Sequence, residues 1–293
     1  MRRSMLFLPG NNPNMLINGG CLGADAVIFD LEDAVAPAEK DAARVLVRNT
    51  MRYMDFRGCE RIVRINSIDT PYWQKDVDTI LPEKPDLLLL PKTGTAADIL
   101  TADAYITEAE TKLGLPRNTV GLIALIETAL GVENAFAIAS SCDRVRALFL
   151  GAEDLTADLQ CKRTKEGREI EYARTRLVVA ARAAGVDVYD TPFTDVNDDA
   201  GIVTDATLAK ALGFTGKASI SPRHVEVINQ VFSPTQKDID YAYAVMDAIE
   251  LAARQGKGAI ALHGKMIDAP IVARARQTIA MAEALGLSRE DRV

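Results

Sequence analysis

Short apolar segments alternate with longer amphipathic stretches along most of the chain. The apolar or β-branched segments are residues 4–8, 26–31, 61–66, 87–90, 121–126, 147–150, 187–190 and 217–220. Between them apolar residues return every three or four positions, most clearly over residues 38–51, 96–113, 169–184 and 197–212. This spacing is typical of helices packed on one side. Gly114, Gly185 and Gly213 follow such stretches, where glycine commonly ends a helix.

The order of these elements predicts the fold. Eight strands separated by helices predict an α/β protein of the (β/α)8 TIM barrel class. An open, doubly wound sheet would show the same alternation, and the count of eight favours the closed barrel. After residue 232, Ser233 or Thr235 can cap a helix over residues 236–254, a glycine-containing segment follows at 255–258, and a last helix runs to residue 284. We therefore expect a barrel catalytic domain over residues 1–232 and a C-terminal helical extension with a lid over residues 233–293.

Composition narrows the function classes. The chain has 48% hydrophobic and 26% charged residues, as soluble globular proteins do, and no apolar run approaches the length of a membrane span. A formal net charge of -7 argues against nucleic-acid binding, which needs a basic face. The first apolar run stops at Pro9-Gly10, too early for a secretory leader, so we expect a cytoplasmic location.

Two apolar runs end in a carboxylate, Glu127 after residues 121–126 and Asp154 after residues 147–150. Barrel enzymes place their active sites at the C-terminal ends of the strands, so both acids are expected at one rim. Two carboxylates can bind one hard cation such as Mg2+, with substrate and water as further ligands. Helix capping or pairing with Lys and Arg is the competing interpretation, and the spacing leaves it open.

Three further features are candidates for chemistry. Arg64 lies inside an apolar strand, where its guanidinium needs an anion, either substrate or a salt bridge to Glu32 or Asp33. Asp268 precedes the last helix and can act as a general acid or base on a lid, although its spacing before Pro270 favours an N-cap. The turn over residues 9–13, PGNNP, offers backbone N–H groups to a phosphate, or is simply a tight turn. Neither His224 nor His263 has the neighbours of a catalytic triad.

Several motifs in order along the chain carry a family resemblance. They are RSMLFLPG at residues 3–10, FDLEDAV at 29–35, VRIN at 63–66, LPKT at 90–93, GAED at 151–154 and GKMID at 264–268. With these motifs the chain resembles the citrate lyase β-subunit family, within the broader group of malyl-CoA, citramalyl-CoA and related acyl-thioester lyases. The resemblance spans nearly the whole chain.

The resemblance implies a set of site residues. It implies that Glu127 and Asp154 bind Mg2+, that Arg64 and Glu127 contact substrate, and that Asp268 is a catalytic lid residue that can close over a neighbouring subunit. Further positions follow from the same resemblance: substrate contacts at Pro9, Gly10, Ser221 and Pro222, and supporting roles for Glu32, Asp33 and Lys92. Relatives often carry His or Asn where this chain has Ser221, which bears on a contact with the thioester arm.

The resemblance also implies a reaction and partners. The reaction is a retro-Claisen or aldol-type cleavage of a citryl thioester, on an acyl-carrier subunit or CoA, to oxaloacetate and an acetyl thioester. Mg2+ and Arg64 would polarise the hydroxyl oxygen, and Asp268 or a water it binds would protonate the thioester enolate. The partners that the resemblance implies are the α and γ subunits of citrate lyase, in a homotrimer or hexamer. The alternatives are a stand-alone malyl-CoA or citramalyl-CoA type lyase and a non-catalytic scaffold.

Overall fold

Eight parallel strands form a closed barrel in the computed structural model, which describes residues 1–56, 58–254, 261–262 and 265–289. Each strand is hydrogen-bonded to the next in chain order, and β8 pairs with β1 to close the cylinder. The strands are β1 (Ser4–Pro9), β2 (Ala26–Asp30), β3 (Glu60–Arg64), β4 (Leu87–Leu90), β5 (Gly121–Ile126), β6 (Val145–Leu150), β7 (Asp187–Asp190) and β8 (Gly216–Ser219). The predicted (β/α)8 fold is confirmed.

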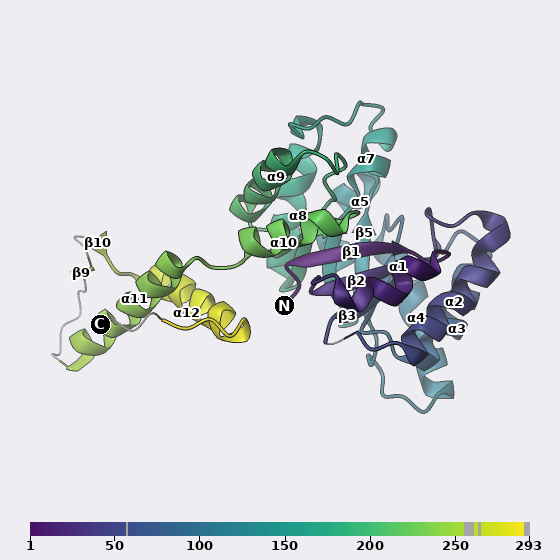
Figure 1. The fold of residues 1–293 in the computed structure, drawn as a ribbon, viewed down its shortest axis with the longest axis horizontal. Helices are drawn as coiled ribbons and strands as arrows, with labels where there is room; N and C mark the ends of the chain where they lie inside the picture. The colour runs from purple at the N-terminus through teal and green to yellow at the C-terminus, as the bar shows by residue number, and fades with distance from the viewer. Residues whose placement is uncertain (57, 255–260, 263–264, 290–293) are drawn as a thin grey trace. The chain divides into compact units, whose positions relative to one another are not determined.

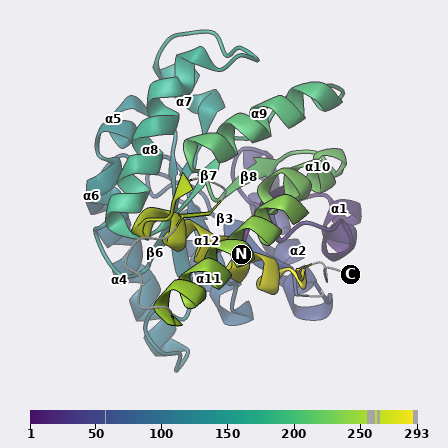
Figure 2. The ribbon, with the colours of Figure 1, turned by 90° about the vertical axis from the view of Figure 1, so that its left-hand side faces the viewer.

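Helices connect the strands and cover the outside of the barrel (Figures 1 and 2). They are α1 (Pro13–Asn18), α2 (Lys40–Tyr53), α3 (Trp73–Ile80), α4 (Ala96–Lys112), α5 (Ala129–Glu133), α6 (Ala135–Ala139), α7 (Ala152–Asp158), α8 (Glu171–Ala184), α9 (Asp199–Leu212) and α10 (Pro222–Phe232). All three predicted terminating glycines adopt the left-handed conformation. Gly114 follows the C-cap of α4 with a φ of 69°, and Gly185 and Gly213 end α8 and α9 with φ of 73° and 105°. The predicted helix at residues 38–51 begins at Lys40, because Pro37–Glu39 forms a 3-10 turn.

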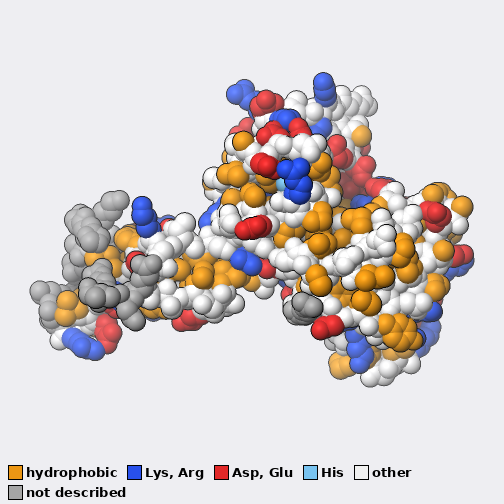
Figure 3. Space-filling view, in the orientation of Figure 1, with side chains coloured by type: hydrophobic (Ala, Val, Ile, Leu, Met, Phe, Trp, Pro, Cys, Tyr) orange, Lys and Arg blue, Asp and Glu red, His pale blue; other side chains and the backbone are white. Residues whose placement is uncertain are grey.

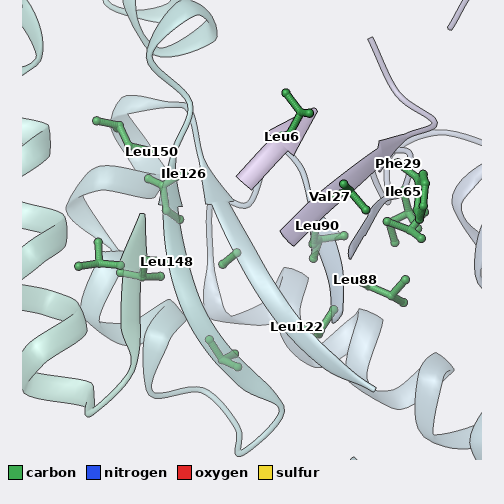
Figure 4. Close-up of a cluster of buried hydrophobic side chains, with 14 of the residues drawn as sticks. Leu6, Val27, Phe29, Ile65, Leu88, Leu90, Leu122, Ile126, Leu148 and Leu150 are labelled. Carbon is green, nitrogen blue, oxygen red and sulfur yellow. The ribbon is translucent and has the colours of Figure 1, made fainter. Parts of the chain in front are cut away.

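Alternation along the strands divides the core in two. Side chains at every second position, including Met5, Ile28, Ile62 and Leu125, fill the barrel interior. The side chains between them face the helices and form the larger cluster seen in Figure 4, where Leu6, Val27, Phe29, Ile65, Leu88, Leu90, Leu122, Ile126, Leu148 and Leu150 are labelled. Because the side-chain period of a strand is two, the residue two positions beyond the last interior side chain points into the barrel mouth.

The C-terminal residues form a second compact unit, Ser233–Val293 together with Met1. It contains α11 (Gln236–Arg254), a two-stranded antiparallel pair of β9 (Ala261–Leu262) and β10 (Lys265–Met266), and α12 (Ala269–Ala284). Ala242, Val245, Ile267 and Ala275 are the buried centre of its small core. The predicted glycine-containing segment at 255–258 and His263 lie outside the described residues.

The molecular surface is mixed in charge on the face shown in Figure 3, where acidic and basic side chains are interspersed. None of the described helices is both long and apolar enough to cross a membrane.

A buried ionic cluster ties β7 and β8 to the helices outside them. Lys217 on β8 is fully buried, and its Nζ lies 2.6 Å from a carboxylate oxygen of Asp190 and 2.6 Å from one of Asp205. Arg174 on α8 donates to both of these carboxylates. Asp190, a strand-end acid, is therefore bound in this cluster and is absent from the lining of the barrel mouth.

Replacing Lys217 by methionine is expected to lower the free energy of unfolding by about 3–5 kcal/mol. The reason is that Arg174 would then be the one cation left to compensate the two buried carboxylates of Asp190 and Asp205. Urea unfolding followed by circular dichroism measures this loss. Lys165→Met is the matched control, since Lys165 also bridges two aspartates, Asp195 and Asp198, but on the exposed surface. An unfolding free energy of Lys217→Met equal to that of Lys165→Met would contradict the structural role of the cluster.

Candidate active site

A cavity of about 520 Å³ opens at the C-terminal ends of the strands. The alternation of side chains along the strands determines three of its charged lining residues. Asp30, Arg64 and Glu127 each lie two positions beyond an interior side chain, namely Ile28, Ile62 and Leu125. Phe7, Leu125 and Phe149 form its apolar floor. The cavity therefore combines charged walls with a water-excluding base, as ligand sites commonly do.

Glu127 is buried, with 2% of its surface exposed, and follows directly after β5. Its Oε1 accepts a hydrogen bond from the Lys92 backbone N–H at 2.7 Å. Burial, together with the charges of Glu32 and Asp154, raises the pKa of Glu127 to about 8. The capping alternative is wrong for Glu127, because the helix that follows is capped by the Thr128 side chain.

Asp154 lies in the first turn of α7 and lines the same cavity. In the described part of the chain its carboxylate has no hydrogen bond or ion pair. The neighbouring Glu153 is exposed, and its Oε1 lies 3.7 Å from Arg163 Nε. Strand alternation does not separate the two acids, because β6 ends at Leu150 and both belong to the helix. Of the two acids, Asp154 is the one whose carboxylate has no partner within the part of the chain that the structure describes.

Gly151 sets the packing between these two elements. A Cβ at this position would lie 2.7 Å from Glu127 Oε2 and 2.8 Å from Glu127 Cβ. Only a glycine therefore lets the end of β6 approach the carboxylate of β5 this closely.

Gly151→Ala is expected to displace the Glu127 carboxylate and weaken binding of a divalent cation about tenfold, in line with other changes next to metal ligands. Isothermal titration with Mg2+ measures the effect. Gly185→Ala is no suitable control because its backbone is left-handed, whereas at Gly94 an added Cβ would lie 3.4 Å or more from its nearest neighbours. Gly94→Ala should leave the Mg2+ affinity unchanged. Equal Mg2+ affinities for the wild type, Gly151→Ala and Gly94→Ala would contradict the requirement for glycine at position 151.

Arg64 is anchored mainly by a residue that the sequence did not single out. Its Nε donates to Asp30 Oδ1 at 2.8 Å and its Nη2 to Asp30 Oδ2 at 2.5 Å. Nη1 lies 3.0 Å from Glu32 Oε2 and 3.7 Å from Asp33 Oδ2, so the predicted ion pair with Glu32 is present as well. Burial acts to lower the pKa of Arg64, but the hydrogen bonds and charge of Asp30 outweigh it and raise the pKa. The guanidinium also lies 5.2 Å from the ring centre of Phe7.

Lys92 links Glu32 to Glu127. Its Nζ lies 3.0 Å from Glu32 Oε1, while its backbone N–H is the donor to Glu127. Lys92 adopts a φ of 53°, a left-handed conformation that is uncommon for residues other than glycine and costs conformational energy. Burial raises the pKa of Glu32, and the charge of Arg64 opposes that shift. Asp33 lines the cavity and is more exposed than Glu32.

The four further substrate contacts that the resemblance implies differ in position. Pro9 lines the cavity, whereas Gly10, Ser221 and Pro222 are not among its lining residues. Packing explains the glycine at position 10. Its N–H donates to the Asp30 carbonyl at 2.8 Å, and a Cβ at this position would lie 2.6 Å from that oxygen. Ser221 is engaged by Ser219, whose hydroxyl donates to its carbonyl at 2.7 Å. Their roles in substrate binding stay predictions.

Asp268 belongs to the C-terminal unit, which is described by itself. It is the N-cap of α12, and its Oδ1 accepts a hydrogen bond from the Ile271 N–H at 3.1 Å. The capping role that the spacing favours is therefore present. Because the side chain is exposed, a second role in catalysis is sterically open and stays a prediction.

The donors at the mouth suit a hard divalent cation. A cation beside Glu127 would offset the burial and the neighbouring negative charges that raise its pKa. Asp154 supplies a second carboxylate without a partner among the described residues. The described residues contain no group of three or more His, Cys, Asp or Glu arranged as metal ligands. Two carboxylates with open positions match Mg2+, which is usually bound by one or two carboxylates, substrate oxygens and water.

Residues 3–222 match the family described as HpcH/HpaI aldolase/citrate lyase, a span that includes every residue lining the cavity. The chain belongs to the HpcH/HpaI aldolase/citrate lyase family. The resemblance seen in the motifs is thereby confirmed.

Relatives within the HpcH/HpaI aldolase/citrate lyase family align over nearly the whole chain. Citrate lyase subunit beta of Leuconostoc mesenteroides subsp. cremoris is 44% identical over 284 residues, which are 97% of this chain and 94% of that protein. Citrate lyase subunit beta of Escherichia coli strain K12 is 41% identical over 289 residues, 99% and 96% of the two chains. A (3S)-malyl-CoA thioesterase of Cereibacter sphaeroides strain ATCC 17025 is 35% identical over 283 residues, 97% and 95% of the two chains.

Solved structures of similar proteins contain magnesium. The protein CitE from Mycobacterium tuberculosis, in complex with magnesium, acetoacetate and coenzyme A, has a TM-score of 0.77 at 30% identity and covers 96% of this chain and 98% of its own. A citrate lyase beta subunit from the same organism, complexed with oxaloacetate and magnesium, has a TM-score of 0.68 at 31% identity, with 80% and 97% covered.

Proposed function

We propose that this chain is a Mg2+-dependent carbon–carbon lyase that cleaves a citryl thioester to oxaloacetate and an acetyl thioester, as the β subunit of citrate lyase. The observation that carries the proposal is the convergence of Glu127, Asp154 and Arg64 on one cavity at the barrel mouth. The citrate lyase β subunits among the relatives, at 44% and 41% identity, favour this substrate over other thioesters.

Each side chain at the mouth has a distinct task in this reaction. Glu127 and Asp154 would bind Mg2+, which when bound supplies Lewis-acid stabilisation of the hydroxyl oxygen that becomes the ketone. Arg64 is held rigidly by Asp30, so its guanidinium is fixed at the cavity wall for the same oxygen or a substrate carboxylate. Phe7, Leu125 and Phe149 exclude water beneath the reacting atoms.

The bond changes define what the lid must supply. The substrate hydroxyl gives its proton to a water in the cavity as its oxygen becomes the ketone of oxaloacetate. The adjacent carbon–carbon bond breaks, and its electron pair moves onto the thioester fragment as an enolate. That enolate takes a proton at carbon to become the acetyl thioester, and Asp268, or a water it binds, would donate this proton after closure of the lid, including a lid from a neighbouring subunit.

Asp268→Asn separates the two roles of this residue. Asparagine caps helices about as well as aspartate, so the free energy of unfolding is expected to stay within about 0.5 kcal/mol of the wild type. The lyase rate is expected to fall about 100-fold or more, because the amide cannot donate the proton. Steady-state kinetics and thermal unfolding check both. A wild-type lyase rate for Asp268→Asn would contradict the catalytic role and leave Asp268 only its role as the N-cap of α12.

The test of the proposed function is release of oxaloacetate by the purified chain with Mg2+ and citryl-CoA. Coupling to malate dehydrogenase and NADH detects the product, and EDTA should stop the reaction until Mg2+ is restored. The relatives that are (3S)-malyl-CoA thioesterases support malyl-CoA as the second substrate to test. Turnover of malyl-CoA or citramalyl-CoA alone would assign the stand-alone activity, and no turnover of any of them would favour a scaffold subunit.

The proposal includes an assembly. By resemblance to citrate lyase, the chain would act in the cytoplasm on an acyl group carried by an acyl-carrier γ subunit or by CoA, together with the α subunit, as a homotrimer or hexamer. Light scattering of the purified chain and co-purification with the two other subunits test these partners.

A further inference from the structure

The helix that carries Asp154 begins without a side-chain cap of its own. The N-cap of α7 is Gly151, and the Gly151 N–H already donates to the Ile126 carbonyl at 2.9 Å. The Ala152 N–H, the first of the helix, donates instead to the hydroxyl oxygen of Thr191 at 3.2 Å. The end of the neighbouring strand β7 thus supplies the cap that α7 lacks.

The backbone of Thr191 is held in place by Lys217. Thr191 is almost fully buried, with 1% of its surface exposed, and lines the cavity. Lys217 Nζ donates to the Thr191 carbonyl at 2.6 Å and to Asp190 at 2.6 Å. The same lysine lies 2.6 Å from Asp205, within the buried ionic cluster described above. Thr191 therefore lies between that cluster and the first turn of α7.

We propose that Thr191 is a positioning residue for the metal ligand Asp154, acting through its hydrogen bond to the Ala152 N–H. This inference rests on the proposed function, because Asp154 is assigned there as a ligand. Asp154 is the third residue of a seven-residue helix, so a small shift of the helix start moves its carboxylate directly. A ligand geometry has to be held within about 0.5 Å, which requires such supporting contacts.

Thr191→Val tests the inference, since valine keeps the β-branched shape and removes the acceptor. We expect the full-length protein, without substrate, to bind Mg2+ about tenfold more weakly in isothermal titration, as for other supporting contacts of metal ligands. Thr191→Ser should restore the affinity. Thr215→Val is the matched control. The Thr215 hydroxyl also accepts a hydrogen bond from a backbone N–H, that of Val188 in β7 at 3.1 Å, but Thr215 does not line the cavity. Its Mg2+ affinity should equal that of the wild type.

Three results would overturn the inference. One is that Thr191→Val binds Mg2+ as tightly as the wild type while Glu127→Gln loses binding. The proposed metal site would then stand, but Thr191 would have no part in positioning it. Another is a raised KM for citryl-CoA in Thr191→Val with an unchanged Mg2+ dissociation constant, which would make Thr191 a substrate contact. The third is no Mg2+ binding by the wild type, which would remove the proposed function as well. If Thr191→Val does not fold, Thr191→Ala serves for the same comparison.

Discussion

Glu127→Gln is expected to lower the lyase rate by about 100-fold to 1000-fold and to lower Mg2+ affinity strongly, the size of effect seen when one charge-stabilising group is lost. Glutamine has nearly the same shape, and its oxygen can still accept the Lys92 N–H that Glu127 accepts at 2.7 Å. What is lost is the negative charge that draws the cation. Oxaloacetate release and Mg2+ titration measure the two effects.

Stability should move in a different direction from activity in this variant. Without Mg2+, the carboxylate of Glu127 is buried beside Glu32 and Asp154, which is why its pKa is raised to about 8. Glutamine has no charge to bury and takes up no proton on folding, so the free energy of unfolding of Glu127→Gln should not fall. Glu153→Gln is the matched control, because Glu153 lines the same cavity but is exposed and near Arg163. Wild-type Mg2+ affinity in Glu127→Gln would contradict the ligand assignment.

Arg64→Leu is expected to lose both stability and activity. Removal of the guanidinium leaves Asp30 without its cation and Glu32 with Lys92 alone. Both carboxylates are almost fully buried, so the loss costs about 3–5 kcal/mol of unfolding free energy. The rate of the fraction that stays folded should also fall about 100-fold, because the guanidinium is the cationic donor at the cavity wall. Urea unfolding and active-fraction kinetics separate the two losses.

Arg144→Leu is the control that separates structure from chemistry. Arg144 is fully buried and pairs with Asp103 and Glu110, so its loss should destabilise the protein to a similar extent. It does not line the cavity, and the folded fraction should keep the wild-type rate. Arg64→Leu with a normal rate per folded molecule would reduce Arg64 to a structural residue.

The barrel and its rim could be predicted from the sequence because both depend on local patterns. Each apolar run fixes a strand to within a few residues. Glu127 follows such a run directly, and Asp154 comes four residues after another. Asp30 was not singled out, although it shares the alternation of Ile28 and therefore had to face the mouth. The apolar run extends through Leu31, which placed the end of the strand one residue too late and drew attention to Glu32 and Asp33.

Other features could not be predicted because they depend on tertiary contacts. The link between Thr191 and α7 joins residues 39 positions apart, and nothing in the local sequence around Gly151 indicates which element caps the helix. The short helix α7 begins almost immediately after β6, so the alternation of a strand cannot indicate which way Glu153 and Asp154 face. The same limit applies to Asp268, for which local spacing indicates a cap and contains no information on lid closure.

The proposed function requires that the barrel mouth binds a divalent cation between Glu127 and Asp154 and uses it on the keto-acid half of the substrate. A crystal of the protein soaked with Mn2+ in place of Mg2+ and with oxaloacetate tests this most directly, because manganese gives an anomalous signal. We expect one strong anomalous peak within about 2.0–2.3 Å of a carboxylate oxygen of each residue, with oxaloacetate as a further ligand of the ion. Oxaloacetate bound in the cavity without a peak, or a peak ligated by other residues, would contradict this requirement.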